Sequence, residues 1–262
     1  MLQRIGLAYL IASGVVLFTG LRVQVAAAAA LLLGYWVAMS WIPVPGYGAG
    51  AIDVPTGNLA AYLDRAILGT QHLWAQAGTW DPEGLLSTLP AVATVLTGVF
   101  AGRWIGASRG EPRRMIGGMM VAGVVGVAVG LVWDFAFPIN KPLWTSSYVV
   151  FTSAAALLFL AACYWTVDLR GWRGWAWPFV VFGMNAIAAF FLSSLAARVI
   201  VLIRLPVGEE GAGIPLKTFL HETLFASWAA PRDASLLFAL SYVAVWVGLI
   251  WLLHRKGIFL KV

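Results

Sequence analysis

Apolar runs of about 18 to 25 residues recur along this chain and constrain its fold more than any other feature. A run of that length crosses the hydrocarbon core of a bilayer as an α-helix. Helix is the required form, because it pairs every backbone polar group inside lipid. The chain is also 61% hydrophobic and only 11% charged, which excludes an ordinary soluble domain. The sequence therefore predicts an all-α, polytopic membrane helix bundle.

The runs predict about seven transmembrane helices. Their expected ranges are Ile5–Gly20, Val23–Ile42, Gly84–Gly102, Met115–Phe137, Leu143–Thr166, Pro178–Ile203 and Ala234–His254. No linker or internal repeat interrupts them, so residues 1–262 are expected to form a single transmembrane domain with an outer loop at 43–83. The start at residue 1 leads directly into an apolar run, and we expect a longer protein upstream.

Loop charges predict the orientation of these helices. Basic residues gather after the third and fifth helices and in the tail, and the positive-inside rule makes that side cytoplasmic. They are Arg103, Arg109, Arg113, Arg114, Arg170, Arg173, Arg255, Lys256 and Lys261. The loop 43–83 holds four acidic residues against Arg65 and is expected to face the periplasm or lumen. The amino terminus is then outside and the carboxyl terminus inside. Because the basic residues are dispersed in short loops, the net charge of +6 does not indicate nucleic acid.

The outer loop carries the first candidate chemistry. Asp81, Pro82 and Glu83 precede the third helix, where they fit an N-cap followed by the first helical turn. Alternatively, the two carboxylates face a cavity and hold a substrate with hydroxyl or amine groups. Earlier in the loop, residues 59–74 predict a short amphipathic helix on the membrane surface. There Asp64 and Arg65 are adjacent and must pair elsewhere, while His72 is either solvated or a general base.

A second outer cluster spans residues 137–148, between the fourth and fifth helices. Two prolines bracket Asn140 and Lys141, which is typical of a tight turn. The alternative is that Lys141 offers a cation, and Asn140 an amide, to a substrate, with Asp134 balancing the cation. Deeper in the bundle, Asn185 either hydrogen-bonds another helix or contacts a carbonyl in a pore, and Arg198 snorkels or lines a cavity.

Two further patterns lie within the helices. Gly126 and Gly130 form a small-xxx-small face, which predicts close packing of the fourth helix against a neighbour. Common hydrolase, nucleotide-binding and metal motifs such as HExxH, CxxC and the P-loop do not occur, so no metal is expected. The single Cys163 excludes an intrachain disulfide.

A series of short motifs, in this order, resembles the transmembrane heparan-α-glucosaminide N-acetyltransferase family and its bacterial relatives. The motifs are Leu2–Gly6, Pro43–Gly46, Tyr62–Arg65 with Leu68 and Gly69, Asp81–Gly84 with Thr88, Asn140–Lys141 with Leu143–Tyr148, Gly183–Asn185, and the closing Arg255–Lys261. They extend across essentially the whole chain, and the set is more specific than any one of them.

The resemblance implies a membrane-bound acyltransferase in a bacterial inner membrane. It would move an acetyl group from cytoplasmic acetyl-CoA to the amine of a glucosamine-type sugar on the outer side. The family's essential histidine lies upstream of the motif that here begins at Leu2. His72, His221 and His254 do not match it, so the catalytic base is unknown and several helices are expected upstream. The chain alone is expected to lack activity unless those helices, or a partner, complete it.

This implied reaction assigns roles to the polar residues. The substrate-binding candidates are Asp64, Arg65, Asp81, Glu83, Asn140, Lys141, Trp144 and Asn185. The candidates for the phosphates of acetyl-CoA are Arg103, Arg109, Arg113 and Arg114, whose positions the positive-inside rule also explains. The expected partners are the bilayer, the amino sugar, acetyl-CoA and either a second copy or the upstream helices.

Two other functions remain open. A small-solute transporter would use Asn185 and Arg198 to line its path, and broken helices in paired positions of two halves would favour it. A membrane subunit without chemistry is the other alternative. The acceptor sugar and the oligomeric state are not determined by the sequence.

Overall fold

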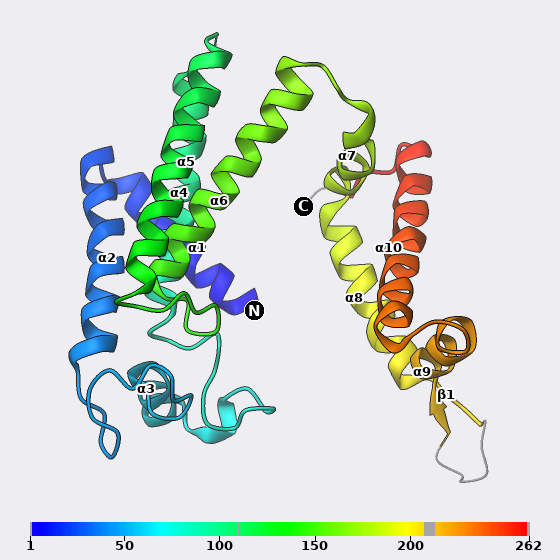
Figure 1. Ribbon diagram of the computed structural model, residues 1–262, viewed down its shortest axis with the longest axis horizontal. Coiled ribbons are helices and arrows are strands. Elements are labelled where there is room, and N and C mark those ends of the chain that lie inside the picture. Colours follow the sequence, from blue (N-terminus) through cyan, green and yellow to red (C-terminus); the bar gives the residue numbers. More distant parts are fainter. Residues whose placement is uncertain (1, 109, 207–212, 261–262) are drawn as a thin grey trace. The chain divides into compact units, whose positions relative to one another are not determined.

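The computed structural model describes residues 2–108, 110–206 and 213–260, and helices make up nearly all of its regular structure (Figure 1). The α-helices are α1 (Leu2–Phe18), α2 (Leu21–Trp41), α3 (Leu59–Leu68), α4 (Thr88–Ala107), α5 (Pro112–Asp134), α6 (Ser146–Cys163), α7 (Trp177–Met184), α8 (Ala186–Leu202), α9 (Leu216–His221) and α10 (Pro231–Arg255). Short helical turns are η1 (Thr70–His72), η2 (Tyr164–Leu169), η3 (Gly174–Ala176) and η4 (Glu222–Ala226). The chain forms two compact units, Met1–Arg170 and Gly171–Val262, which are described separately. The prediction of a single transmembrane domain stays a prediction.

Several helices of the described chain are long and apolar enough to cross a membrane. Five pass by length and composition, namely α2, α4, α5, α6 with η2, and α10. The bent pair made by η3–α7 and α8 would make six, and the apolar part of α1 is shorter. The expected all-α membrane bundle is confirmed, and the protein is an integral membrane protein.

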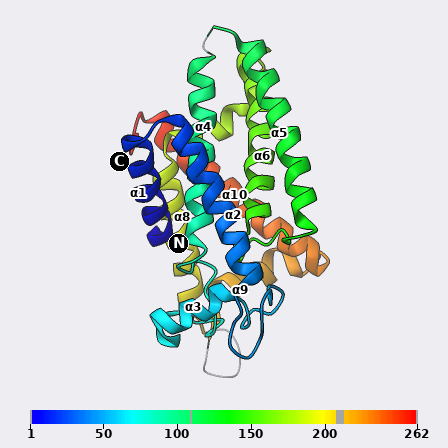
Figure 2. The same cartoon turned by 90° about the vertical axis from the view of Figure 1, so that its left-hand side faces the viewer.

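The first unit is a bundle of α1, α2, α4, α5 and α6 (Figure 1). The loop that contains α3 and η1 lies at one end of this bundle, and the turn between α4 and α5 lies at the other (Figure 2). A buried cluster that includes Tyr35, Met39, Phe137 and Leu143 joins the bundle to α3 through Leu59. The Tyr35 hydroxyl also donates a 2.7 Å hydrogen bond to the Leu143 carbonyl. The outer loop is therefore packed onto the bundle.

Helices α5 and α6 pack closely through glycines. A Cβ placed on Gly126 would lie 2.6 Å from the Ala154 Cβ, and one on Gly130 would lie 2.8–2.9 Å from backbone and Cβ atoms of Phe151. Only residues without a side chain allow helices to approach this closely. The predicted small-xxx-small packing is confirmed.

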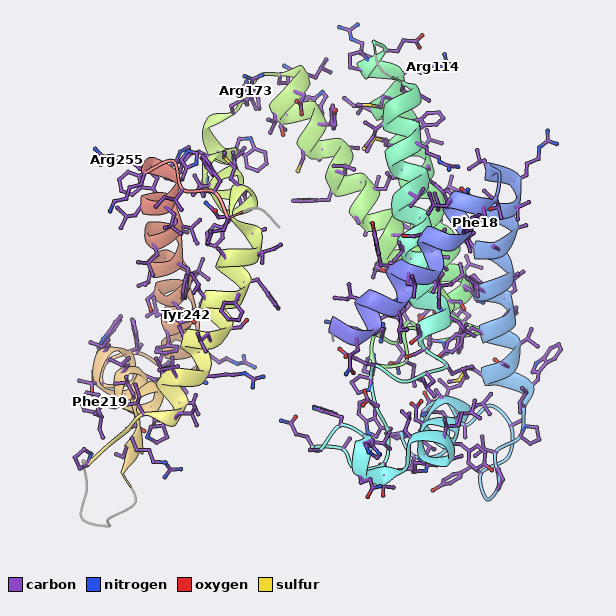
Figure 3. All side chains as sticks on the ribbon, turned by 180° about the vertical axis from the view of Figure 1, so that it is seen from behind. Phe18, Arg114, Arg173, Phe219, Tyr242 and Arg255 are labelled. Atoms are coloured by element: carbon purple, nitrogen blue, oxygen red, sulfur yellow. The ribbon has the colours of Figure 1, made fainter. Side chains whose placement is uncertain are left out.

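The second unit contains α7, α8, α9, α10 and a two-stranded ribbon, β1 (Arg204–Leu205) and β2 (Ile214–Pro215). Tyr242 of α10 lies between α10 and α8, where its hydroxyl donates a 2.6 Å hydrogen bond to the Ser193 carbonyl (Figure 3). The expected continuous helix 178–203 is instead two helices that meet at 77°. The break occurs at Asn185, whose φ of −131° and ψ of 38° leave the helical region.

Candidate functional site

Arg4 joins three distant segments of the first unit. It lies in the first turn of α1 and is only 8% exposed. One guanidinium nitrogen donates a 2.6 Å hydrogen bond to the Pro82 carbonyl, in the loop before α4. Its Cζ also lies 4.1 Å from the centroid of the Trp144 ring, in the loop before α6. A cation this close to an indole face is attracted by the ring electrons.

Trp144 has a strained backbone. It is the one non-glycine residue with a positive φ, 54°, in the described chain, and a bulky side chain rarely adopts that conformation. Its indole nitrogen donates a 3.1 Å hydrogen bond to the Thr94 hydroxyl on α4. The ring also meets Tyr148 edge-on, with centroids 5.2 Å apart. These contacts, with Arg4 on the ring, hold the conformation, and strain of this kind gathers at functional sites.

Asn140 shapes the turn that presents Trp144. Its side-chain oxygen accepts a 3.1 Å hydrogen bond from the Leu143 backbone, and its own backbone N–H donates to the Thr145 hydroxyl at 3.0 Å. The fully buried Thr145 hydroxyl in turn donates to the Pro138 carbonyl at 2.8 Å. Because of this network, α6 begins at Ser146 instead of the expected Leu143. The Asn140 oxygen is occupied by the turn, while Lys141 is exposed.

The carboxylates of the outer loop are arranged differently from the expected helix cap. The two Asp81 oxygens accept hydrogen bonds from the Glu83 backbone at 2.8 Å and the Trp74 backbone at 3.1 Å. Helix α4 begins only at Thr88, after the N-cap residue Ser87. The expectations that Asp81 caps this helix and that Glu83 lies in its first turn are therefore wrong. Both carboxylates instead interact electrostatically with the Arg4 guanidinium.

Arg65 and His72 are both bound to backbone carbonyls of the loop. The Arg65 guanidinium donates to the Thr56 and Thr79 carbonyls, each at 2.7 Å, and so ties two parts of the loop together. The Nδ1 atom of the exposed His72 lies 2.7 Å from the Leu68 carbonyl. Helix α3 and η1 form where a short amphipathic helix was predicted. Arg65 therefore stabilises the loop through these two hydrogen bonds.

Asp64 is fully buried beneath the same loop. Its Oδ1 accepts a 2.9 Å hydrogen bond from the Leu85 backbone, while its Oδ2 has no hydrogen-bond partner. The carboxyl lies against the Cα of Gly84, where an added Cβ would overlap it. Burial raises the pKa of Asp64 above its ordinary value, against the lowering effect of the Leu85 hydrogen bond. Asp64 therefore contacts the loop backbone instead of a cavity.

Of the arginines proposed for acetyl-CoA, Arg114 lies at the other end of the bundle, where Figure 3 labels it. Arg114 forms a 3.2 Å ion pair with Glu111, and Arg113 is exposed. A cavity of about 220 Å³ lies beside this pair, and its lining includes Trp104. Arg109 lies outside the described residues.

Arg103 forms a separate contact, with the turn between α1 and α2. Its guanidinium donates a 2.7 Å hydrogen bond to the side-chain oxygen of Gln24. Gln24 is fully buried and donates in turn to the Thr19 carbonyl at 2.6 Å. Arg103 thus stabilises this turn, and Arg113 and Arg114 remain the better placed of the described arginines for an anionic ligand.

Asn185 belongs to the second unit, whereas the other substrate-binding candidates belong to the first. Its side chain is fully buried, accepts a 2.9 Å hydrogen bond from the Leu260 backbone and donates to the Ile258 carbonyl at 3.2 Å. The expected partner was another helix or a carbonyl in a pore. Instead the amide binds the chain segment that follows α10. Arg198 is exposed on α8.

Replacing Asn185 with leucine is expected to destabilise the second unit by about 2 kcal/mol. The change removes two partly buried hydrogen bonds and leaves the Ile258 carbonyl and the Leu260 N–H without these partners. Protease sensitivity of the segment after α10, followed by mass spectrometry, measures the effect. Ser193→Ala is the matched control on α8, because its hydroxyl bonds only the local Phe190 carbonyl. Equal protease sensitivity of the two variants would contradict a stabilising role for the hydrogen bonds of Asn185 with Ile258 and Leu260.

The contacts join the short sequence motifs in groups. Arg4, from the motif Leu2–Gly6, touches both Pro82, from Asp81–Gly84, and Trp144, from the motif that ends at Tyr148. Asp64, from Tyr62–Arg65, packs on Gly84. In the second unit, Asn185 binds the closing motif at Ile258 and Leu260.

Comparison with known proteins agrees with these motifs. No protein-family model matches the chain. Human heparan-alpha-glucosaminide N-acetyltransferase is 29% identical in an alignment 265 positions long, which covers 88% of this chain. The mouse enzyme of the same name is 27% identical in an alignment 259 positions long, which covers 87% of this chain. Over most of its length the chain is therefore similar to heparan-alpha-glucosaminide N-acetyltransferases. It spans 36% of the length of each of these relatives.

Reasoning from the sequence did not place Arg4, Thr94 and Tyr148 among the candidate site residues. Arg4 carried a signal, because it is the charged residue directly ahead of the first apolar run and lies inside the motif Leu2–Gly6. Tyr148 also carried a signal as the last residue of the motif Leu143–Tyr148, whereas Thr94 carried none, because a threonine in an apolar helix is ordinary. Their roles depend on Trp144, whose backbone conformation could not be anticipated.

Proposed function

We propose that this chain forms part of a membrane N-acetyltransferase that moves an acetyl group from acetyl-CoA to the amine of a glucosamine-type sugar. The observation that carries the proposal is the convergence at Arg4, where segments around residues 4, 82 and 144 meet although they are far apart in the sequence. All three segments belong to motifs that resemble this family. A charged cluster held this firmly in a membrane protein is expected to be functional.

The sugar is proposed to bind at the Arg4 cluster, which consists of Arg4, Pro82, Glu83, Trp144 and Tyr148. Trp144 and Tyr148 supply aromatic surface, and both are half-buried. Glu83 supplies a carboxylate that can hold an ammonium or hydroxyl group of the sugar. Arg4 balances this charge and fixes the indole. The exposed Lys141 is proposed as a contact at the rim.

The opposite end of the bundle is proposed to receive acetyl-CoA from the cytoplasm. The exposed Arg113 and the nearby Arg114 suit the phosphates of coenzyme A, because guanidinium groups bind phosphate through paired hydrogen bonds. The small cavity beside Trp104 and Glu111 offers a recess at this end.

The acetyl transfer itself requires a neutral amine to attack the thioester carbonyl carbon, with the coenzyme A thiolate as the leaving group. It also requires donors for the negative charge that develops on the carbonyl oxygen. No histidine of this chain is assigned as the base. The Nδ1 atom of His72 lies against the Leu68 carbonyl, and none of the motifs that resemble the family contains a histidine. The residues of this chain are proposed to bind and orient the sugar.

Changing Glu83 to glutamine is expected to raise the KM for glucosamine by about 10- to 100-fold, because a neutral amide attracts the sugar ammonium less strongly. The measurement is transfer of radiolabelled acetyl from acetyl-CoA to glucosamine by the chain in membranes. Asp53→Asn is the matched control, since Asp53 is an exposed acid of the same loop. An unchanged KM for Glu83→Gln would remove Glu83 from the site.

The proposal as a whole is tested by acetyl-CoA binding to the purified chain. Bound ligand raises the unfolding temperature in proportion to its concentration above Kd, and Arg113→Gln with Arg114→Gln should reduce that effect. If acetyl-CoA causes no shift and no acetyl is transferred, the proposal fails. Transport has less support, because the described chain has one bent helix pair, and the Asn185 side chain at its break is bound to the tail.

A further inference from the structure

We infer that Asp64 is a positioning residue of the Arg4 cluster: its buried carboxyl fixes the backbone at Gly84 and Leu85, which holds the Pro82 carbonyl against Arg4. Within the reaction this role rests on the proposed function. The geometric part does not, and it can be tested without any activity.

The contacts of Asp64 lead to Arg4 through a short piece of backbone. The carboxyl accepts a 2.9 Å hydrogen bond from the Leu85 N–H, and it lies against Gly84 so closely that a Cβ there would be 2.6 Å from its Cγ. The carbonyl of Pro82, two residues before Gly84, accepts a 2.6 Å hydrogen bond from the Arg4 guanidinium. A shift of the loop at Gly84 therefore moves the Pro82 carbonyl, and with it the stacking of Arg4 on Trp144.

The second oxygen of Asp64 explains why the residue is sensitive to protonation. Oδ2 is buried and has no hydrogen-bond partner, so the neutral acid fits this place better than the carboxylate. The negative charge of Asp81, from the same loop, also disfavours ionisation of Asp64. The positive charge of Arg65 on α3 favours the ionised form of Asp64, but this effect is the smallest of those acting on Asp64. The Arg65 guanidinium is bound to the Thr56 and Thr79 carbonyls.

The sign of the pH dependence follows from these contacts. Burial raises the pKa of Asp64 in the folded chain above its value in the unfolded chain. The folded state then holds the Asp64 proton more tightly than the unfolded state does. The contribution of protonated Asp64 to the free energy of unfolding is therefore complete below the ordinary carboxyl pKa, and it is lost as pH rises through the raised pKa.

The first test compares the unfolding temperature of the purified full chain with Asp64→Asn between about pH 4 and pH 8. Asparagine keeps the acceptor for Leu85 but cannot ionise. We expect the wild-type unfolding temperature to fall as pH rises and the fall to be smaller in Asp64→Asn. Asp53→Asn, at an exposed acid of the same loop, should keep the wild-type slope. An Asp64→Asn slope equal to that of the wild type overturns the inference.

The second test is a double-mutant cycle between Asp64→Ala and Arg4→Met. If Asp64 acts through the Pro82 carbonyl, the double variant should be less destabilised than the sum of the single ones, by about tenfold in the unfolding equilibrium constant. Additive effects overturn the inference. Neither test measures acetyl transfer, so failure of the proposed function leaves both results readable.

Activity gives a third result if the chain transfers acetyl. Asp64→Ala should raise the KM for glucosamine at least about tenfold, and Asp64→Asn should restore it to within about twofold of the wild type. A loss of kcat in Asp64→Asn with unchanged KM would show that Asp64 touches the reacting atoms, and it would overturn the positioning role.

Discussion

Arg4→Met is expected to lower the free energy of unfolding of the first unit by about 2 kcal/mol. The change leaves the Pro82 carbonyl without its charged donor, which costs about 1.5–3 kcal/mol. It also removes the cation from the face of Trp144, worth about 0.5–2 kcal/mol. Part of this loss is offset, because methionine does not have to be desolvated as a buried guanidinium does.

The measurement for Arg4 is reversible unfolding of the purified chain in mixed detergent micelles. Arg22→Met is the matched control, because Arg22 is an exposed arginine near the start of α2. It should change stability by less than about 0.5 kcal/mol. A similar effect of the two variants would show that the contacts of Arg4 with Pro82 and Trp144 contribute little.

Gly130→Ala is expected to destabilise the first unit by about 2 kcal/mol. Its new Cβ would lie 2.8–2.9 Å from the Cβ, Cα and N of Phe151, and a backbone cannot move aside as a flexible side chain can. Helices α5 and α6 would have to separate, and overpacking of this kind costs about 1–3 kcal/mol. The loss should appear in the same detergent unfolding measurement.

The control for Gly130 lies on the same helix. Gly117 has no heavy atom within 4 Å of an added Cβ, so Gly117→Ala should be neutral or stabilising by up to about 1 kcal/mol. The comparison separates helix propensity from helix contact, because both variants make the same chemical change. Equal effects at the two positions would contradict close packing of α5 on α6 at Gly130.

The long helices and one of their contacts could be predicted from the sequence. Apolar runs in lipid must form helices, because no water is available to satisfy the backbone. Gly126 and Gly130 also predicted a close helix contact, because glycine has no side chain to keep a neighbouring helix away and its position is known from the sequence. Charge and motif order also identified Asp81, Glu83 and Trp144 as members of one candidate site.

The details of that site could not be predicted in the same way. Asp81 and Glu83 precede α4 as a cap would, yet the chain places a turn there, because Asp64 and Arg4 bind its backbone from other segments. Asn185 breaks the run 178–203, which the sequence predicts as one continuous helix. Its amide binds Ile258 and Leu260 of the tail instead. These outcomes depend on partners tens of residues away, which local propensity does not register.

The sequence by itself determined that this protein is a helical membrane protein and which family it resembles. Both follow from local properties, namely the length of apolar runs and the order of short motifs. The tertiary structure alone decided that Arg4 is the centre of the cluster, that Trp144 is strained and that Asp64 is buried with an unpartnered oxygen. The physical reason is that burial, ion pairing and backbone strain arise only when distant segments exclude solvent together.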